Sequence, residues 1–315
     1  MRIERLNTVS SDVMRPLLEE ERHYLMRHFL WDTQYSFKLK LQLLKYGRID
    51  GLAAFEQDKP IGYIYWHNFQ TELYLSGYYF SSKSDYQNIL DFLSYAAEFI
   101  KTKYSAAVIE GQLLCIDDKK LSEIFENEGY VTVERNYMSV DFSKAKFDSH
   151  SKLPEGLRIR NLSDLGFDMI DEIADSMKKS YVGTLDEWIT RSFGSFQGCR
   201  NFISNLFEFP VYGRLEEDLS FVIADDSDSI IGMIFICKAS NTTSHLVQVS
   251  VIPDYQRRGI GRFMVEECVK RLKREKFKNA VLMVTSGNVK AINLYKKYGF
   301  ETVTKFYSIN FNKIK

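Results

Sequence analysis

Two segments in the first half of the chain recur in the second half at a constant spacing. Residues 128–133 (EGYVTV) resemble residues 298–303 (YGFETV), and residues 60–65 (PIGYIY) resemble residues 230–235 (IIGMIF). The aligned glycines lie 170 positions apart in both pairs. Two equal offsets that far apart predict duplication of a whole domain rather than a short solenoid repeat.

The length agrees with two domains of ordinary size. The chain has 315 residues, and a typical domain has about 150. Residues 143–156 (SKAKFDSHSKLPEG) form the most linker-like segment near the middle, between two runs that read as strands. We therefore predict a first domain over residues 1–148 and a second over residues 155–315.

The pattern of apolar residues predicts mixed helices and strands. In the second half the predicted order is a strand, helices, three strands, a helix, a strand, a helix and a last strand. This order is typical of an α/β sandwich with a mixed sheet. The first half follows it more faintly. The expected second-half elements are strands 157–160, 220–224, 230–237, 245–252, 280–285 and 301–310, and helices 167–179, 185–207 (broken near Gly194 and Gly198), one after Gly261, and 289–297.

Composition excludes several classes of protein. Lys plus Arg and Asp plus Glu both count 42, and this zero net charge argues against a chain that coats nucleic acid or an anionic membrane. No stretch approaches the roughly 18 apolar residues of a membrane span. The four cysteines form no C-x-x-C motif, so neither a disulfide framework nor a metal site is expected. We expect a soluble, cytoplasmic protein without a bound metal.

The segment with the clearest chemistry is 249–261 (VSVIPDYQRRGIG), which reads as a strand, a tight basic turn and a helix. Glycines let the backbone of such a turn approach a ligand closely, and the N–H groups at a helix start favour phosphate. Arg257, Arg258 and Arg262 add local positive charge to a neutral chain. The spacing fits neither a P-loop nor a Rossmann motif. The segment therefore predicts a pyrophosphate site.

Residues 256–261 (QRRGIG) resemble the acetyl-CoA signature [Q/R]-x-x-G-x-[G/A] of the GCN5-related N-acetyltransferase (GNAT) family. Residues 288–300 (NVKAINLYKKYGF) resemble the family's N-x-x-A-x-x-[LF]-Y-x-x-x-G-F block. Together they cover the core of residues 157–311. The resemblance implies two tandem acyl-CoA N-acyltransferase-like domains, each a mixed, mostly antiparallel sheet flanked by helices.

The resemblance also implies roles for individual residues. Tyr295 matches the phenol that protonates the departing CoA thiolate, although packing on its helix is an alternative. Asn288 matches a side chain that contacts the cofactor, or it caps a helix. The glycines could serve a tight turn alone, and the arginines could be solvent-exposed without a ligand. The implied cofactor-binding residues are Val249, Ser250, Val251, Gln256, Arg257, Arg258, Gly259, Ile260, Gly261, Arg262 and Asn288.

The general base is the least certain part of the predicted site. In several branches of the family an acidic or histidine side chain on the strand before the turn takes the proton, and His245 lies near that place. Its ordinary pKa near 6.5 suits the task. The alternative is a half-exposed histidine at a strand start. Gln248 could only orient a water, and Asp225 and Asp226 read as turn residues.

The first half lacks the features of the basic turn. The corresponding residues, 81–86 (SSKSDY), contain no arginine pair and no G-x-G. We therefore predict a degenerate copy that does not bind pyrophosphate. The tyrosine-rich run between Tyr63 and Tyr79 either lines a groove or, more commonly for aromatic strand residues, packs in a core.

The resemblance implies an N-acetyltransferase in which the C-terminal domain moves an acetyl group directly from acetyl-CoA, its cosubstrate, to a primary amine. The acceptor amine is not identified by the sequence. A non-catalytic acyl-CoA-binding regulatory protein is the alternative. A nucleic-acid-binding module is disfavoured by the charge balance. We expect a monomer or a homodimer with no nucleic-acid or membrane partner.

Overall fold

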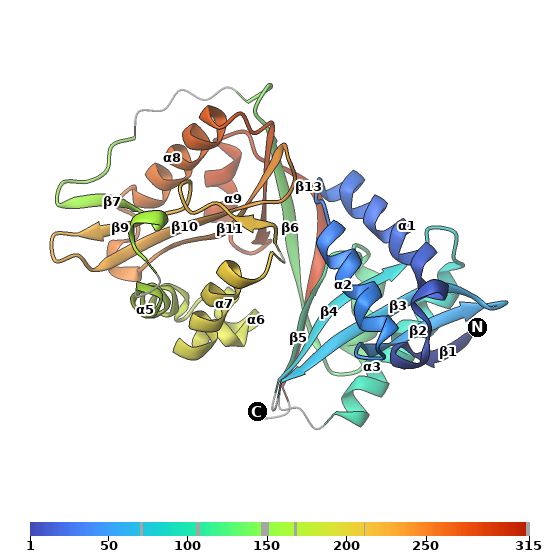
Figure 1. Ribbon diagram of the computed structural model, residues 1–315. Coiled ribbons are helices and arrows are strands. Elements are labelled where there is room, and N and C mark those ends of the chain that lie inside the picture. Colours follow the sequence, from blue (N-terminus) through green and yellow to red (C-terminus); the bar gives the residue numbers. More distant parts are fainter. Residues whose placement is uncertain (70–71, 105–107, 146–150, 167–168, 211, 313–315) are drawn as a thin grey trace. The chain divides into compact units, whose positions relative to one another are not determined.

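The chain forms two compact units in a computed structural model, which describes residues 1–69, 72–104, 108–145, 151–166, 169–210 and 212–312. One unit comprises Met1–Arg135 together with Thr304–Lys315, and the other comprises Asn136–Val303. We call them the N-terminal unit and the C-terminal unit (Figure 1).

These units divide the chain differently from the predicted ranges 1–148 and 155–315. The C-terminal residues of the chain complete the N-terminal unit, because Tyr307–Asn312 pair antiparallel with Val108–Leu113. Part of the predicted linker belongs to the C-terminal unit. There the backbone N–H of Ser151 donates to the carboxylate of Glu266 at 3.2 Å, whereas residues 146–150 lie outside the described chain. Neither the strand pairing nor this hydrogen bond can be predicted from local composition, because each joins segments that are far apart in the sequence.

The N-terminal unit is a sheet with helices on both faces. The strand order is β1-β2-β3-β4-β5-β13, and the pairs are antiparallel except for the parallel pair β4–β5. Its elements are β1 (Arg2–Arg5), α1 (Ser11–Phe29), α2 (Gln34–Lys45), β2 (Asp50–Glu56), β3 (Lys59–Phe69), β4 (Glu72–Phe80), α3 (Tyr86–Lys103), β5 (Val108–Leu113), α4 (Lys119–Asn127), the start of β6 (Val131–Asp141) and most of β13 (Glu301–Asn312).

Two apolar layers hold this unit together. On one face α1 and α2 pack on alternate strand residues such as Ala53 and Tyr63, and on the other α3 and α4 pack on neighbours such as Leu52 and Ile64. This alternation is the period of two that a strand imposes. Tyr63, Tyr78 and Tyr79 are buried, so these members of the tyrosine-rich run belong to the core.

The C-terminal unit has the predicted order of elements through the helix Val289–Lys296, whereas the expected last strand, 301–310, lies mostly in the N-terminal unit as part of β13. Its strands run β7-β9-β10-β11-β12-β6, and β11 and β12 pair in parallel. One expected feature is wrong: Gly198 does not break a helix but lies inside α7. The elements are β7 (Leu157–Asn161), α5 (Ile170–Tyr181), α6 (Leu185–Ile189), α7 (Phe196–Glu208), β8 (Arg214–Leu215), β9 (Phe221–Asp225), β10 (Ile230–Lys238), β11 (Thr243–Val251), α8 (Ile260–Arg274), β12 (Asn279–Thr285) and α9 (Val289–Lys296).

Helices cover both faces of this second sheet as well. Helices α5 and α7 pack on residues such as Val222 and Met233, whereas α8 and α9 pack on the opposite face, on residues such as Ile223 and Ile234. Figure 1 shows α8 and α9 on one side of the sheet and α5, α6 and α7 on the other. This arrangement confirms the predicted α/β sandwich.

Both units carry the same irregularities, which supports the predicted duplication. The register between the second and third sheet strands shifts so that Ile61 in one unit and Ile231 in the other are extra residues. The next pair of strands shifts at Ser76 and at Val247. These bulges lie 170 and 171 positions apart. Bulges are fixed features of a sheet, and their recurrence extends the match from sequence to backbone geometry.

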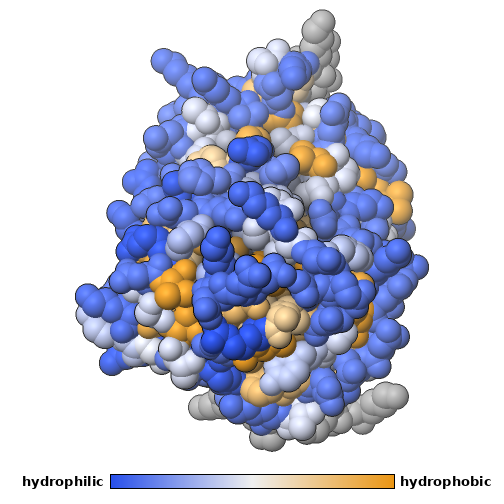
Figure 2. All heavy atoms as spheres, turned by 90° about the vertical axis from the view of Figure 1, so that its right-hand side faces the viewer, coloured by the Kyte–Doolittle hydropathy of each residue, from blue (hydrophilic) through white to orange (hydrophobic). Residues whose placement is uncertain are grey.

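One face of the molecule, shown in Figure 2, is mainly hydrophilic and carries separate hydrophobic patches. Cys199, Cys237 and Cys268 are buried, as expected for small apolar side chains. In the described ranges no helix is long and apolar enough to cross a bilayer.

The role of β13 in the N-terminal unit is testable with Ile309→Ala. Ile309 is fully buried and packs with residues of α3, so we expect a loss of about 2–5 kcal/mol of unfolding free energy. Urea denaturation followed by circular dichroism measures it. Val303→Ala, on the same strand but 53% exposed, is the control. Equal losses in both variants would contradict the assignment of β13 to this core.

Candidate active site

The parallel strands β11 and β12 part from each other in the middle of the C-terminal unit. Their pairing covers four residue pairs, from Thr243 with Asn279 to Leu246 with Leu282. Strand β11 nevertheless continues to Val251 and β12 to Thr285. Backbone polar groups that leave a ladder need other partners. The opening between the strands can therefore accept hydrogen bonds from, or donate them to, an extended ligand.

The bulge in β11 lies directly at this opening. Val247 is inserted between Leu246, which pairs with Ile236, and Gln248, which pairs with Phe235. Beyond it, a chain of side-chain hydrogen bonds runs along one face of the strand. The Tyr181 hydroxyl donates to Oε1 of Gln248 at 2.9 Å, and the Gln248 amide donates to Ser250 Oγ at 3.0 Å. This chain fixes the orientation of the buried Gln248.

The basic turn after β11 has an exposed backbone with two positive φ angles. Arg257 and Gly259 have φ angles of 62° and 85°, and an L-residue tolerates that region poorly. Gly259 is the N-cap of α8, and no side chain caps that helix. A Cβ built on Gly259 would meet nothing within 4 Å. The uncapped N–H groups and the open space fit a phosphate.

The polar side chains of the turn differ in their contacts. The Arg258 guanidinium lies over the Tyr255 ring, 4.9 Å from its centroid, while Arg257 and Arg262 are exposed. Gln256 donates through its side-chain amide to the carbonyl oxygen of Val251 at 2.9 Å. This hydrogen bond of the Gln256 side chain closes the turn onto the end of β11.

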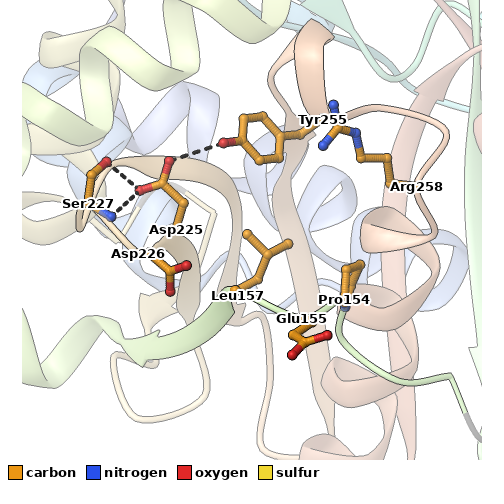
Figure 3. A pocket seen from close by; sticks show the side chains of 9 residues that line it. Pro154, Glu155, Leu157, Asp225, Asp226, Ser227, Tyr255 and Arg258 are labelled. Carbon is orange, nitrogen blue, oxygen red and sulfur yellow. Dashed lines mark hydrogen bonds between the residues drawn. The ribbon is translucent and has the colours of Figure 1, made fainter.

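A cavity of about 400 Å³ borders the turn on the side of Tyr255 and Arg258. Figure 3 shows that the Tyr255 hydroxyl donates a hydrogen bond to the Asp225 carboxylate, which also accepts one from the Ser227 hydroxyl. The hydrogen bonds from Ser227 hold the pKa of Asp225 below its usual value. Glu155, Asp225 and Asp226 line the cavity, and three carboxylates disfavour a phosphate. The turn prediction for the two aspartates is confirmed by the hairpin that they form.

Helix α9 brings the second motif to the start of α8, where the side chain of Leu294 lies 3.9 Å from a Cβ built on Gly261. Asn288 caps α9 by accepting from the N–H of Ala291 at 3.1 Å, which is the helix-cap alternative. Tyr295 is 7% exposed. Burial, followed by the charge of Asp186, raises the pKa of Tyr295 well above its ordinary value. The phenol is therefore protonated at neutral pH.

His245 is buried rather than half-exposed. It is 2% exposed, lies where β11 still pairs with β12, and packs edge-on to the Tyr212 ring at 5.8 Å. Burial lowers the pKa of His245 to about 4. The imidazole is neutral at pH 7, but it holds a proton only weakly there, which reduces its value as a general base.

Asp186, on α6, is the acidic residue that the sequence analysis missed. Its Oδ1 accepts from the hydroxyl of Thr285, the last residue of β12, at 2.6 Å. A Cβ built on Gly287 would lie 3.0 Å from Leu185, so α6 packs against the loop after β12. Nothing in the sequence signals this, because Asp186 and Thr285 are 99 positions apart and share no motif.

Comparison with known proteins gives a family for this region. Residues 183–300 match the model of the acetyltransferase (GNAT) family. Over 59 residues, 19% of this chain, the sequence is 37% identical to the ribosomal protein bS18 alanine N-acetyltransferase of Escherichia coli (strain K12). That match spans 40% of the length of the curated relative.

Solved GNAT structures resemble the whole chain. A GCN5-related N-acetyltransferase from Sphaerobacter thermophilus has a TM-score of 0.69 at 13% identity, over 98% of this chain and 95% of that one. A tandem GNAT protein from the clavulanic acid biosynthesis pathway has a TM-score of 0.59 at 9% identity, over 85% and 83%. At these identities the likeness shows the fold, a tandem GNAT architecture.

The phosphate site is testable with Gly259→Glu. CoA at 100 times its Kd stabilises a protein by about 2.7 kcal/mol, and the variant places a carboxylate at the uncapped start of α8. We expect the variant to lose the rise in melting temperature that CoA gives the native chain. Gly166→Glu is the matched control, since Gly166 also has a positive φ, 64°, and open space around it. An unchanged CoA shift in Gly259→Glu would contradict the site.

Proposed function

We propose that the protein is an acetyl-CoA-dependent N-acetyltransferase whose C-terminal unit transfers the acetyl group directly to a primary amine. One observation carries the proposal: the opening between β11 and β12 leads straight to the uncapped, glycine-containing start of α8. An extended arm and a pyrophosphate need these two features in this order. The match of residues 183–300 to the GNAT family model supports the same reaction.

The backbone supplies most of the cosubstrate contacts in this proposal. The pantetheine arm would lie along Val249–Val251, and the N–H groups between Arg257 and Gly261 would hold the pyrophosphate. The exposed Arg257 and Arg262 add positive charge at that end of the site. The N–H groups of β11 near its bulge at Val247 would stabilise the oxyanion that forms when an amine attacks the thioester carbonyl.

In this proposal Asp186 accepts a proton from the acceptor amine, and Tyr295 donates a proton to the leaving thiolate. The Asp186 carboxylate, held by Thr285 beside the opening, attracts the ammonium form of the acceptor and takes its proton. The neutral amine then attacks the carbonyl, the C–S bond breaks, and the Tyr295 phenol protonates the thiolate. The raised pKa of Tyr295 keeps this proton on the oxygen until the thiolate forms. The nitrogen loses its second proton as the amide forms, and this proton returns through water to the Tyr295 oxygen, so that the phenol is restored. We infer Asp186 as the base in preference to His245 because of their positions: Asp186 contacts Thr285, beyond the paired part of β11 and β12, whereas His245 lies where the two strands still pair.

The acceptor is proposed only as a class, a primary amine. The curated relative acts on an alanine of a ribosomal protein, so a peptide with an N-terminal alanine is a sensible first probe. Small alkylamines and aminoglycosides complete the range of amines that this reaction can acylate.

The function is tested by release of free thiol from acetyl-CoA in the presence of each amine. We expect at least one amine to give turnover that exceeds the rate without amine, together with an acetylated product by mass spectrometry. Tyr295→Phe should retain the CoA-induced rise in melting temperature but lose at least tenfold in kcat. Binding of CoA with no transfer to any amine would favour the non-catalytic acyl-CoA-binding protein instead.

The base assignment is tested by Asp186→Asn. Removal of a general base costs about 10²–10⁴-fold in rate, so we expect a loss of that size in kcat/KM for an amine that is protonated at the assay pH. Glu187→Gln is the matched control, because the Glu187 carboxylate accepts from the N–H of Gly183 at 2.7 Å instead. A large loss in His245→Gln with none in Asp186→Asn would return the role to His245.

A further inference from the structure

The N-terminal unit retains the strand geometry of the C-terminal site. Strand β4 pairs with β5 in parallel over four residue pairs, ending with Leu75 and Gly111, and then continues to Phe80 paired with β3 but no longer with β5. Its bulge at Ser76 lies next to this point. The turn that follows, residues 81–85, therefore occupies the place in its unit that the phosphate turn occupies in the other.

A carboxylate of the chain itself sits in this turn. Glu20, on α1, accepts from the backbone N–H of Ser82 at 3.1 Å and from the Ser82 hydroxyl at 3.4 Å. The Ser81 hydroxyl is 2.9 and 3.0 Å from its two oxygens. The buried Tyr79 donates its hydroxyl at 3.1 Å. Four donor groups thus converge on one anionic side chain, as they would on an oxyanion.

Helix α1 and helix α3, which follows the turn in the sequence, both contribute to the surroundings of the turn. The Tyr24 ring, one helical turn after Glu20, packs against the Tyr79 ring at 5.7 Å. The N-cap of α3 is Asp85, whose carboxylate accepts from the N–H of Gln87 at 2.8 Å. The start of α8 has no such cap. Two carboxylates therefore stand where the C-terminal unit presents open backbone and arginines.

We propose that Tyr79, Ser81 and Ser82 form an anion-binding site whose resident ligand is the Glu20 carboxylate, and that the site takes inorganic phosphate once this carboxylate is removed. The native N-terminal unit is then closed to nucleotides by its own side chain. This gives a physical reason for the prediction that a unit with opened strands and a bulge does not bind pyrophosphate. The chain accordingly binds one CoA.

The test compares melting temperatures in potassium phosphate and in potassium chloride of equal ionic strength at pH 7. Glu20→Ala should melt several degrees lower than the native chain in chloride, because the four donors lose their acceptor. Phosphate should recover at least half of that loss. The native chain and Glu19→Ala, an exposed neighbour on the same helix, should show no phosphate-specific change.

Glu20→Gln provides a second variant that keeps the site filled. Its amide oxygen can still accept from the donors, so we expect a smaller loss and no recovery by phosphate. Equal phosphate effects in all variants, or an unchanged melting temperature of Glu20→Ala in chloride, would overturn the proposal. Equilibrium dialysis that found two CoA molecules per native chain would also overturn it. The phosphate measurement involves no acetyl-CoA, so its result is independent of the proposed transferase function.

Discussion

The C-terminal unit depends on the point where β11 stops pairing with β12. Parallel strands normally satisfy each other's backbone groups, and here the bulge at Val247 and the early end of the ladder prevent that beyond Leu246. We propose that the edge of β11 that no longer pairs with β12 is the surface that binds acetyl-CoA. The proposed catalytic side chains, Asp186 and Tyr295, come from elements that pack around this opening.

Comparison of the two units separates what backbone geometry provides from what side chains provide. Both units have the parallel pair that parts after four residues and the bulge beside it. They differ in the turn that follows. Gly259 leaves one turn open and uncapped, whereas Glu20 and Asp85 supply carboxylates to the other. We therefore propose that the N-terminal unit has kept the shape of the site and that these two acidic side chains close it to a phosphate ligand.

Much of the fold and the open backbone of the basic turn could be predicted because their signals are local. The strand and helix periods, the basic turn at 256–261 and the helix cap at Asn288 depend on residues within one or two turns of each other. Asp186 was not predicted because Thr285, which donates a hydrogen bond to it, is 99 positions away. The half-exposed reading of His245 was wrong for a related reason, since its burial comes from Tyr212 and the neighbouring strands.

The sequence by itself determined the duplication, the order of elements and the turn chemistry of the C-terminal half. Glycine conformation, helix-start N–H groups and apolar periodicity act over a few residues, so a linear reading captures them. Only the tertiary structure decided that residues 304–312 complete the N-terminal unit. It also placed Asp186 beside Thr285 and Glu20 against Ser82. Strand pairing and side-chain hydrogen bonds between distant segments depend on distance in space, which spacing along the chain does not encode.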